Sequence, residues 1–126
     1  MWLITKNGLL SVVQNLDSKG PGDALLVRGR VRGDLEHFAD AAARLGGRPE
    51  VVETPRADYG FRVTASREVL AVYLAGQVGA LDYPNFKSEV AKDDPERAHV
   101  YSRVWSVLRD LRWIGGRPGR KQGGRS

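Results

Sequence analysis

The chain has 126 residues, of which 41% are hydrophobic and 28% are charged, and its formal net charge is +5. This length is sufficient for one domain with a hydrophobic core that needs no metal or disulfide. Because the sequence has no cysteine, disulfides, thiolate nucleophiles and cysteine-ligated zinc are excluded.

The excess positive charge lies at one end of the chain. Residues 1–111 contain 15 lysines and arginines and 15 acidic residues, whereas residues 112–126, RWIGGRPGRKQGGRS, contain five cations and no acid. This last segment is also rich in glycine and has little to bury. The sequence therefore predicts a single α+β domain over residues 1–111 and a disordered basic Gly/Arg tail over residues 112–126.

Membrane insertion is not indicated by the sequence. No apolar run approaches the roughly 18 residues that a spanning helix needs. The N-terminal stretch MWLITKNGLLSVVQ lacks the cationic start and small-residue cleavage site of a signal peptide. We expect a cytoplasmic protein without membrane contact, present as a monomer or homodimer.

The first half of the chain alternates like strands and then like a helix. WLITK and LLSVVQ flank Asn7-Gly8, which predicts a hairpin with a type I′ turn. ALLVRGRV (24–31) reads as a third strand, and Asp34 is a candidate N-cap for a helix of about eleven residues. The expected buried face of that helix is Leu35, Phe38, Ala39, Ala42 and Leu45.

The second half predicts another hairpin and further helices. PEVVET and YGFRVTA are expected to pair, and Ser66 to cap a helix with the apolar stripe Val69, Leu70, Tyr73, Leu74, Val78 and Leu81. DYPNFKSEVAK reads as a turn and a short helix, after which Asp94 and Pro95 begin a last helix over about 95–111. The stripe expected on that helix is Ala98, Tyr101, Val104, Trp105, Leu108 and Leu111.

This order of elements is typical of a two-layer ferredoxin-like α+β sandwich. We expect an antiparallel sheet of four to five strands, helices on one face, and an extra C-terminal helix. The usual last strand is missing, and one strand of the N-terminal hairpin could fill its place. The alternative is another two-layer α+β arrangement with a different strand order.

Four arginines are the first candidate binding site. Alternation places Val27, Val31, Tyr59, Phe61 and Val63 on the packed face of the sheet and Arg28, Arg30, Arg32 and Arg62 on the other. These arginines could be solvated or paired with Glu50 and Glu53, could bind an acidic protein surface, or could contact phosphates. Base stacking on the sheet is disfavoured because the aromatic residues fall on the opposite face. The role of this face depends on whether the last helix covers it.

Two further segments carry candidate contacts. The loop at 82–87 offers Tyr83, Asn85, Phe86 and Lys87 for recognition, although Tyr83 and Phe86 could instead close the core while Asp82 or Asn85 caps the short helix. In the tail, nucleic acid could be contacted by Arg117, Arg120, Lys121 and Arg125, or these residues could only keep the end of the chain solvated.

Catalytic signals are sparse. His37 and His99 lie on different predicted helices, and the nearby acids do not supply a third metal ligand. The sequence contains no G-x-S-x-G, P-loop, H-E-x-x-H or G-x-G-x-x-G pattern. No cofactor and no metal site are predicted.

Four stretches resemble a family. MWLITKNGLLSVVQ, LLVRGRVRGDLE, DYGFRV and DYPNFKSEVA with VYSRVWSVL resemble a set of small proteins of bacteria and of their phages and plasmids, to which no activity is assigned. The resemblance covers residues 1–111. It implies a small cytoplasmic accessory protein of a mobile element that binds a host or phage component.

The functional expectation is therefore a non-enzymatic module that binds a macromolecular partner, most readily a protein. The alternative is a nucleic-acid-binding module that uses the sheet arginines and the tail. A weaker alternative is a small enzyme that uses His37 or His99.

Overall fold

The computed structural model describes residues 1–16 and 24–114, and the chain divides into two compact units, Met1–Asp82 and Tyr83–Ser126. The first unit contains β1 (Trp2–Thr5), β2 (Gly8–Gln14), β3 (Ala24–Gly29), α1 (Arg32–Arg44), β4 (Val52–Glu53), β5 (Phe61–Ser66) and α2 (Arg67–Gly79). The second contains α3 (Phe86–Asp93), α4 (Pro95–Leu108) and α5 (Leu111–Ile114). The domain predicted over residues 1–111 extends across the boundary between these units.

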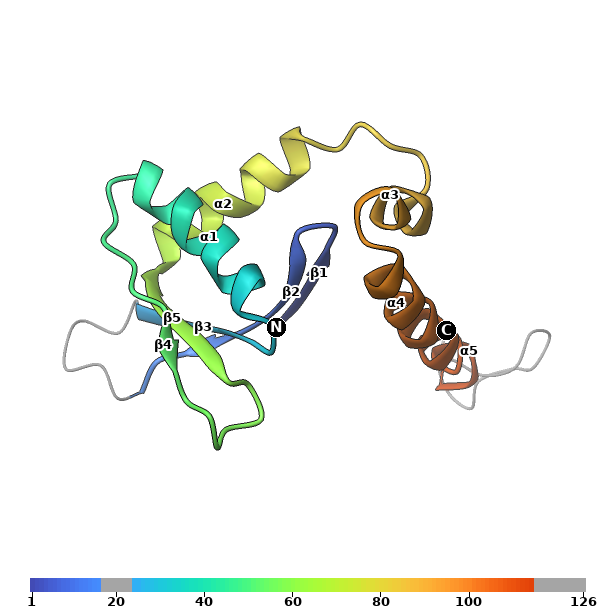
Figure 1. Ribbon diagram of the computed structural model, residues 1–126, viewed down its shortest axis with the longest axis horizontal. Helices are drawn as coiled ribbons and strands as arrows, with labels where there is room; N and C mark the ends of the chain where they lie inside the picture. The colour runs from blue at the N-terminus through green and yellow to red at the C-terminus, as the bar shows by residue number, and fades with distance from the viewer. Residues whose placement is uncertain (17–23, 115–126) are drawn as a thin grey trace, which may run out of the picture. The chain divides into compact units, whose positions relative to one another are not determined.

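The first unit is a two-layer α+β sandwich on a five-stranded antiparallel sheet with the order β1-β2-β3-β5-β4. The path β3-α1-β4-β5-α2 is ferredoxin-like, and β2 pairs with β3 where the missing last strand would lie. Figure 1 shows α1 and α2 on the same face of the sheet. The predicted fold class is confirmed, and the N-terminal hairpin completes the sheet.

The core lies between the sheet and these two helices. Its buried members come from β2, β3, β5, α1 and α2 and include Leu10, Val12, Leu25, Val27, Val63, Leu35, Phe38, Ala42, Leu70 and Tyr73. The Phe38 and Tyr73 rings meet edge to face with centroids 5.0 Å apart. At the helix ends the expected stripes are wrong: Leu45 and Val78 are exposed, and Leu81 lies beyond the end of α2 at Gly79.

The predicted type I′ turn at Asn7-Gly8 is wrong, although the hairpin it marks is present. Thr5 pairs with Gly8, so the two turn residues are Lys6 and Asn7. Neither has a positive φ, whereas Gly8 has a φ of 139°. The Thr5 hydroxyl oxygen accepts a hydrogen bond from the Asn7 N–H at 3.1 Å. The glycine is therefore the first residue of β2.

Helix α1 begins earlier than predicted. Val31 occupies the N-cap position in an extended conformation without a side-chain cap, and Asp34 lies in the first turn. The Asp34 side chain is instead buried, and its Oδ2 accepts a hydrogen bond from the Leu9 N–H at 3.0 Å. A Cβ atom at Gly8 would overlap the Asp34 carboxyl group. The same aspartate thus connects the start of α1 to the hairpin.

The second unit is built from the helices α3 and α4, which pack on each other. Asp94 caps α4 as predicted, because its Oδ1 accepts from the Arg97 N–H at 2.9 Å and Pro95 follows. Val90 and Tyr101 are buried. The helix predicted over 95–111 ends at Leu108, and α5 extends into the segment that was expected to be tail.

Candidate functional site

The four predicted arginines do not form one row. Arg28 in β3 and Arg62 in β5 lie directly opposite each other, and they face away from the core because their strand neighbours Val27 and Val63 are buried in it. Strand β3 ends at Gly29. Arg30 therefore follows the strand, and Arg32 is the first residue of α1. Only two of the four arginines share the sheet face.

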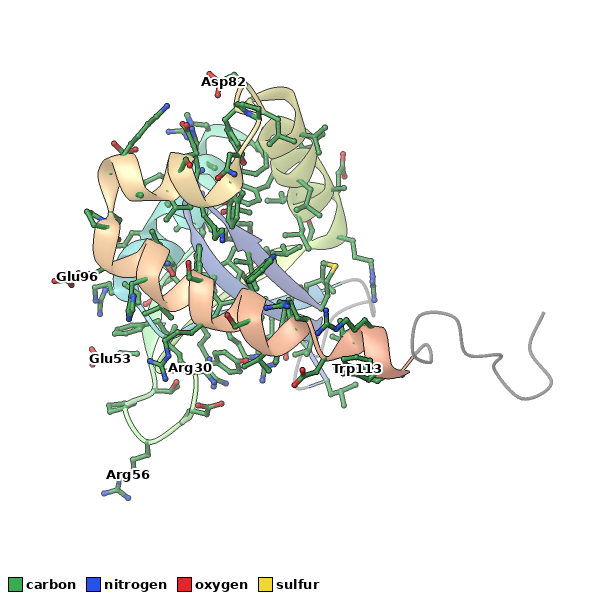
Figure 2. All side chains as sticks on the ribbon, turned by 90° about the vertical axis from the view of Figure 1, so that its right-hand side faces the viewer. Arg30, Glu53, Arg56, Asp82, Glu96 and Trp113 are labelled. Atoms are coloured by element: carbon green, nitrogen blue, oxygen red, sulfur yellow. The ribbon has the colours of Figure 1, made fainter. Side chains whose placement is uncertain are left out.

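Arg30 and Arg32 are paired with carboxylates of the same unit. The Arg30 guanidinium lies 2.9 Å from Asp58 Oδ2, and the hydrogen bond to Asp58 raises the pKa of Arg30. Arg32 lies 3.3 Å from Glu53, one of the two acids expected as partners, and 3.8 Å from Glu36. These pairs are half exposed, so each contributes little to stability. Figure 2 shows Arg30 and Glu53 at the same end of the unit.

The placement of Tyr59 on the packed face is wrong. Tyr59 precedes β5, and the guanidinium carbons of Arg28 and Arg30 lie 4.8 Å and 4.4 Å from the centre of its ring. Val31 is also exposed rather than packed, because it caps α1. Phe61 and Val63 do face the core. The guanidinium groups of Arg28 and Arg30 therefore lie over the ring of Tyr59.

The loop at 82–87 makes contacts within its own unit. The Asn85 side chain caps α3 by accepting from the Ser88 N–H at 2.9 Å. Phe86 stacks on Tyr101 with ring centres 5.7 Å apart, and Tyr83 lies 6.4 Å from Phe86. The Lys87 ammonium lies 4.5 Å from the centre of the Trp105 ring. Each of the four predicted contact residues therefore has a local structural partner.

A different surface in the second unit is apolar and exposed. Trp105, expected in the core, is 52% exposed, and Val107 is 68% exposed. We call this the α4–α5 apolar surface, made of Val100, Trp105, Val107, Leu108, Leu111, Trp113 and Ile114, all of which are exposed. Val100, Val104 and Val107 follow the i, i+4, i+7 spacing of one helix face. Large apolar side chains that are exposed in such number mark candidate sites of association.

Arginines lie beside both tryptophans of this surface. The Arg109 guanidinium lies 5.2 Å from the centre of the Trp105 ring, and the Arg112 guanidinium lies 4.6 Å from that of Trp113. Figure 2 shows Trp113 on the short helix α5. Residues 97–114 contain four arginines and one aspartate, a net charge of +3. The surface is therefore suited to a partner that is apolar at its centre and acidic at its edge.

The two histidines of the sequence lie in different units of the structure. His37 Nδ1 lies 3.3 Å from the Tyr73 hydroxyl, which is a contact of the first unit, and His99 is exposed on α4. Within residues 1–16 and 24–114, no three His, Asp or Glu side chains are grouped so that they could hold a metal ion. The predicted tail contacts, Arg117, Arg120, Lys121 and Arg125, lie outside the described residues.

No family model, curated protein or solved structure that was compared with the chain matches it. In the described part of the chain no helix is both long and apolar enough to cross a bilayer.

Proposed function

We propose that this chain is a non-enzymatic protein-binding module whose contact site is the α4–α5 apolar surface. The observation that carries the proposal is the exposure of two tryptophans and five aliphatic side chains on α4 and α5, with arginines beside both indole rings. Tryptophan and arginine are the residue types that dominate the binding energy of protein interfaces. The resemblance noted in the sequence supports an accessory role in the cytoplasm, with a host or phage protein as partner.

The partner is an acidic protein segment that presents an apolar helix face or strip. Val100, Val104 and Val107 offer a row along one side of α4, against which an apolar helix face or strip can pack side by side. Arg103, Arg109 and Arg112 provide positive charge around it. Aliphatic side chains contribute little to binding of a phosphate backbone, so a protein partner agrees better with this composition.

A matched pair of substitutions tests the site. Val107 and Val78 are 68% and 67% exposed, on α4 and α2 respectively. We expect full-length protein with Val107→Asp to lose capture of the partner from extract of the source cells, and Val78→Asp to retain it. With the partner then purified, Val107→Asp should weaken the affinity by about 2 kcal/mol, or roughly thirtyfold.

A charge-reversal substitution is the second test of the proposed binding site. Arg109→Glu should weaken binding and reduce its salt dependence, whereas Arg56→Glu should not; Figure 2 shows Arg56 at the tip of the loop between β4 and β5. Equal binding by the Val107→Asp and Val78→Asp proteins would refute the proposed site. A captured species that lacks an acidic segment would refute the proposed partner.

One observation favours nucleic acid as a second candidate. Residues 83–126 carry the whole net charge of +5, with ten cations and five acids, whereas residues 1–82 are neutral. In that case affinity for generic duplex or single-stranded oligonucleotides would fall steeply with salt. The nucleic-acid alternative requires binding that Arg109→Glu weakens and the uncharged substitution Val107→Asn leaves unchanged. Loss of capture after nuclease treatment would also favour it.

A further inference from the structure

A pocket of about 310 Å³ lies on the side of the sheet that faces away from α1 and α2. It is lined by Leu26, Arg48, Glu50, Val52, Arg62 and Thr64. Leu26 pairs with Thr64 and Val52 with Arg62, so three neighbouring strands form its floor. Its volume lies at the lower end of the range of about 300–1,000 Å³ for small-molecule sites.

The positive charges at this pocket are only partly compensated by the protein. Arg28 and Arg62 are direct cross-strand partners, an arrangement in which like charges repel. The Nε atoms of both residues are buried and have no hydrogen-bond partner among the described residues. Arg28 donates to the neutral Ser11 hydroxyl at 2.9 Å. Within the described ranges neither guanidinium forms an ion pair, in contrast to Arg30 and Arg32.

Two buried donors and a like-charged pair favour the binding of an anion at this pocket. Arg guanidinium groups bind carboxylates and phosphates through paired N–H donors. The pocket contains Arg48, Arg62 and Glu50, and Arg28 lies beside it, so these four groups have a net charge of +2. A phosphoryl dianion would balance this charge, and Thr64 would add a hydroxyl donor.

We propose that this pocket binds the phosphoryl group of a small phosphomonoester or inorganic phosphate. Arg62 and Arg48 hold the phosphoryl oxygens, and Arg28 supplies further positive charge from the adjacent strand. Leu26 and Val52 provide an apolar floor for the organic part of a monoester. All residues that line the site belong to the first unit.

Binding to the full-length protein tests the proposal, with inorganic phosphate and AMP as probes. We expect phosphate to raise the melting temperature and to shift the amide resonances of Arg62 and Thr64, relative to sodium chloride of equal ionic strength. AMP should bind more tightly than phosphate if a monoester is the ligand, and equally if free phosphate is. Sodium acetate, which offers a single carboxylate, should bind at least tenfold more weakly than phosphate.

Substitution locates the site. Arg62→Gln and Arg48→Gln should each weaken phosphate binding at least tenfold, while Arg56→Gln, in the loop between β4 and β5, should leave it unchanged. Without phosphate, Arg62→Gln should not lower the melting temperature, because it relieves repulsion from Arg28. The proposal is overturned if chloride reproduces the effect of phosphate, if acetate binds as tightly, or if Arg62→Gln and Arg48→Gln both retain wild-type affinity.

Discussion

The carboxylate of Asp34 accepts a hydrogen bond from the backbone N–H of Leu9, 25 positions earlier in the chain, at 3.0 Å. Asp34 is 5% exposed and lies in the first turn of α1, whereas Leu9 belongs to β2. The contact therefore joins the start of the first helix to the strand that replaces the usual last strand of the fold. A carboxylate is also favoured at this position by the positive end of the helix dipole.

Removing the Asp34 carboxylate should destabilise the protein. Asp34→Ala leaves the Leu9 N–H without this acceptor, and we expect a loss of about 1–3 kcal/mol in the free energy of unfolding, measured in urea. Asp34→Asn, which keeps one acceptor oxygen, should lose less. Asp40→Ala on the exposed side of α1 is the control. A loss for Asp34→Ala no larger than that for Asp40→Ala would contradict this role.

Gly8 should be intolerant of any side chain. Its φ is 139°, and a Cβ atom would overlap the Asp34 carboxyl group. We expect Gly8→Ala to lower the free energy of unfolding by about 1–3 kcal/mol. Gly33, inside α1, has open space around it, so Gly33→Ala should raise stability by about 0.5 kcal/mol. Equal effects of the two substitutions on the urea midpoint would show that the turn geometry is wrong.

Tyr73 should ionise at a higher pH than an ordinary tyrosine. Burial, together with the Asp34 charge, raises the pKa of its phenol above the ordinary value of 10.0. The folded protein therefore holds this proton more tightly than the unfolded chain, and that part of its stability is lost as pH rises above about 10. Phenolate absorbance during alkaline titration should show a late ionisation step that is absent in Tyr73→Phe. Identical late titration in both proteins would contradict the assignment.

The cap of α4 should weaken in acid. The hydrogen bond from the Arg97 backbone lowers the pKa of Asp94 below its ordinary value of 3.8. The ionised Asp94 side chain therefore stabilises the folded protein at pH values above 3.8. This stabilisation is lost as the pH falls through the lower pKa that Asp94 has in the folded state. The protection of the Arg97 amide against hydrogen exchange, corrected for the intrinsic pH dependence of exchange, should fall there, and Asp94→Ala should remove this change in protection. Asp93→Ala is the control, and unchanged exchange in Asp94→Ala would refute the cap.

The sheet and its helices could be predicted because their signals are local. Strand alternation, the Ser66 and Asp94 caps and the spacing on α1 each agree with the final packing. The prediction that four arginines share one sheet face is right only for Arg28 and Arg62, because β3 ends at Gly29. A Cβ atom at that position would overlap the Leu35 side chain, and this close approach of α1 is a tertiary effect that alternation does not reveal.

The exposed surface of α4 was missed for a related reason. Tyr101 and Trp105 suggest one apolar stripe, and Val100, Val104 and Val107 form another. Periodicity does not say which stripe is buried, and in the structure Tyr101 is buried while Trp105 and Val107 are exposed. The available signal was that the helix is apolar on more than one side, which is unusual for a helix with only one packed face.

Site-specific photo-crosslinking tests the proposed binding surface most directly. A photoreactive phenylalanine analogue would replace Val107 in one full-length protein and Val78 in another, since these positions are almost equally exposed. We predict that the probe at 107 forms a covalent adduct with an acidic protein in extract of the source cells, and that the probe at 78 does not. Equal adducts from both positions, or adducts at 107 only with nucleic acid or with a second copy of the chain, would contradict the proposed function.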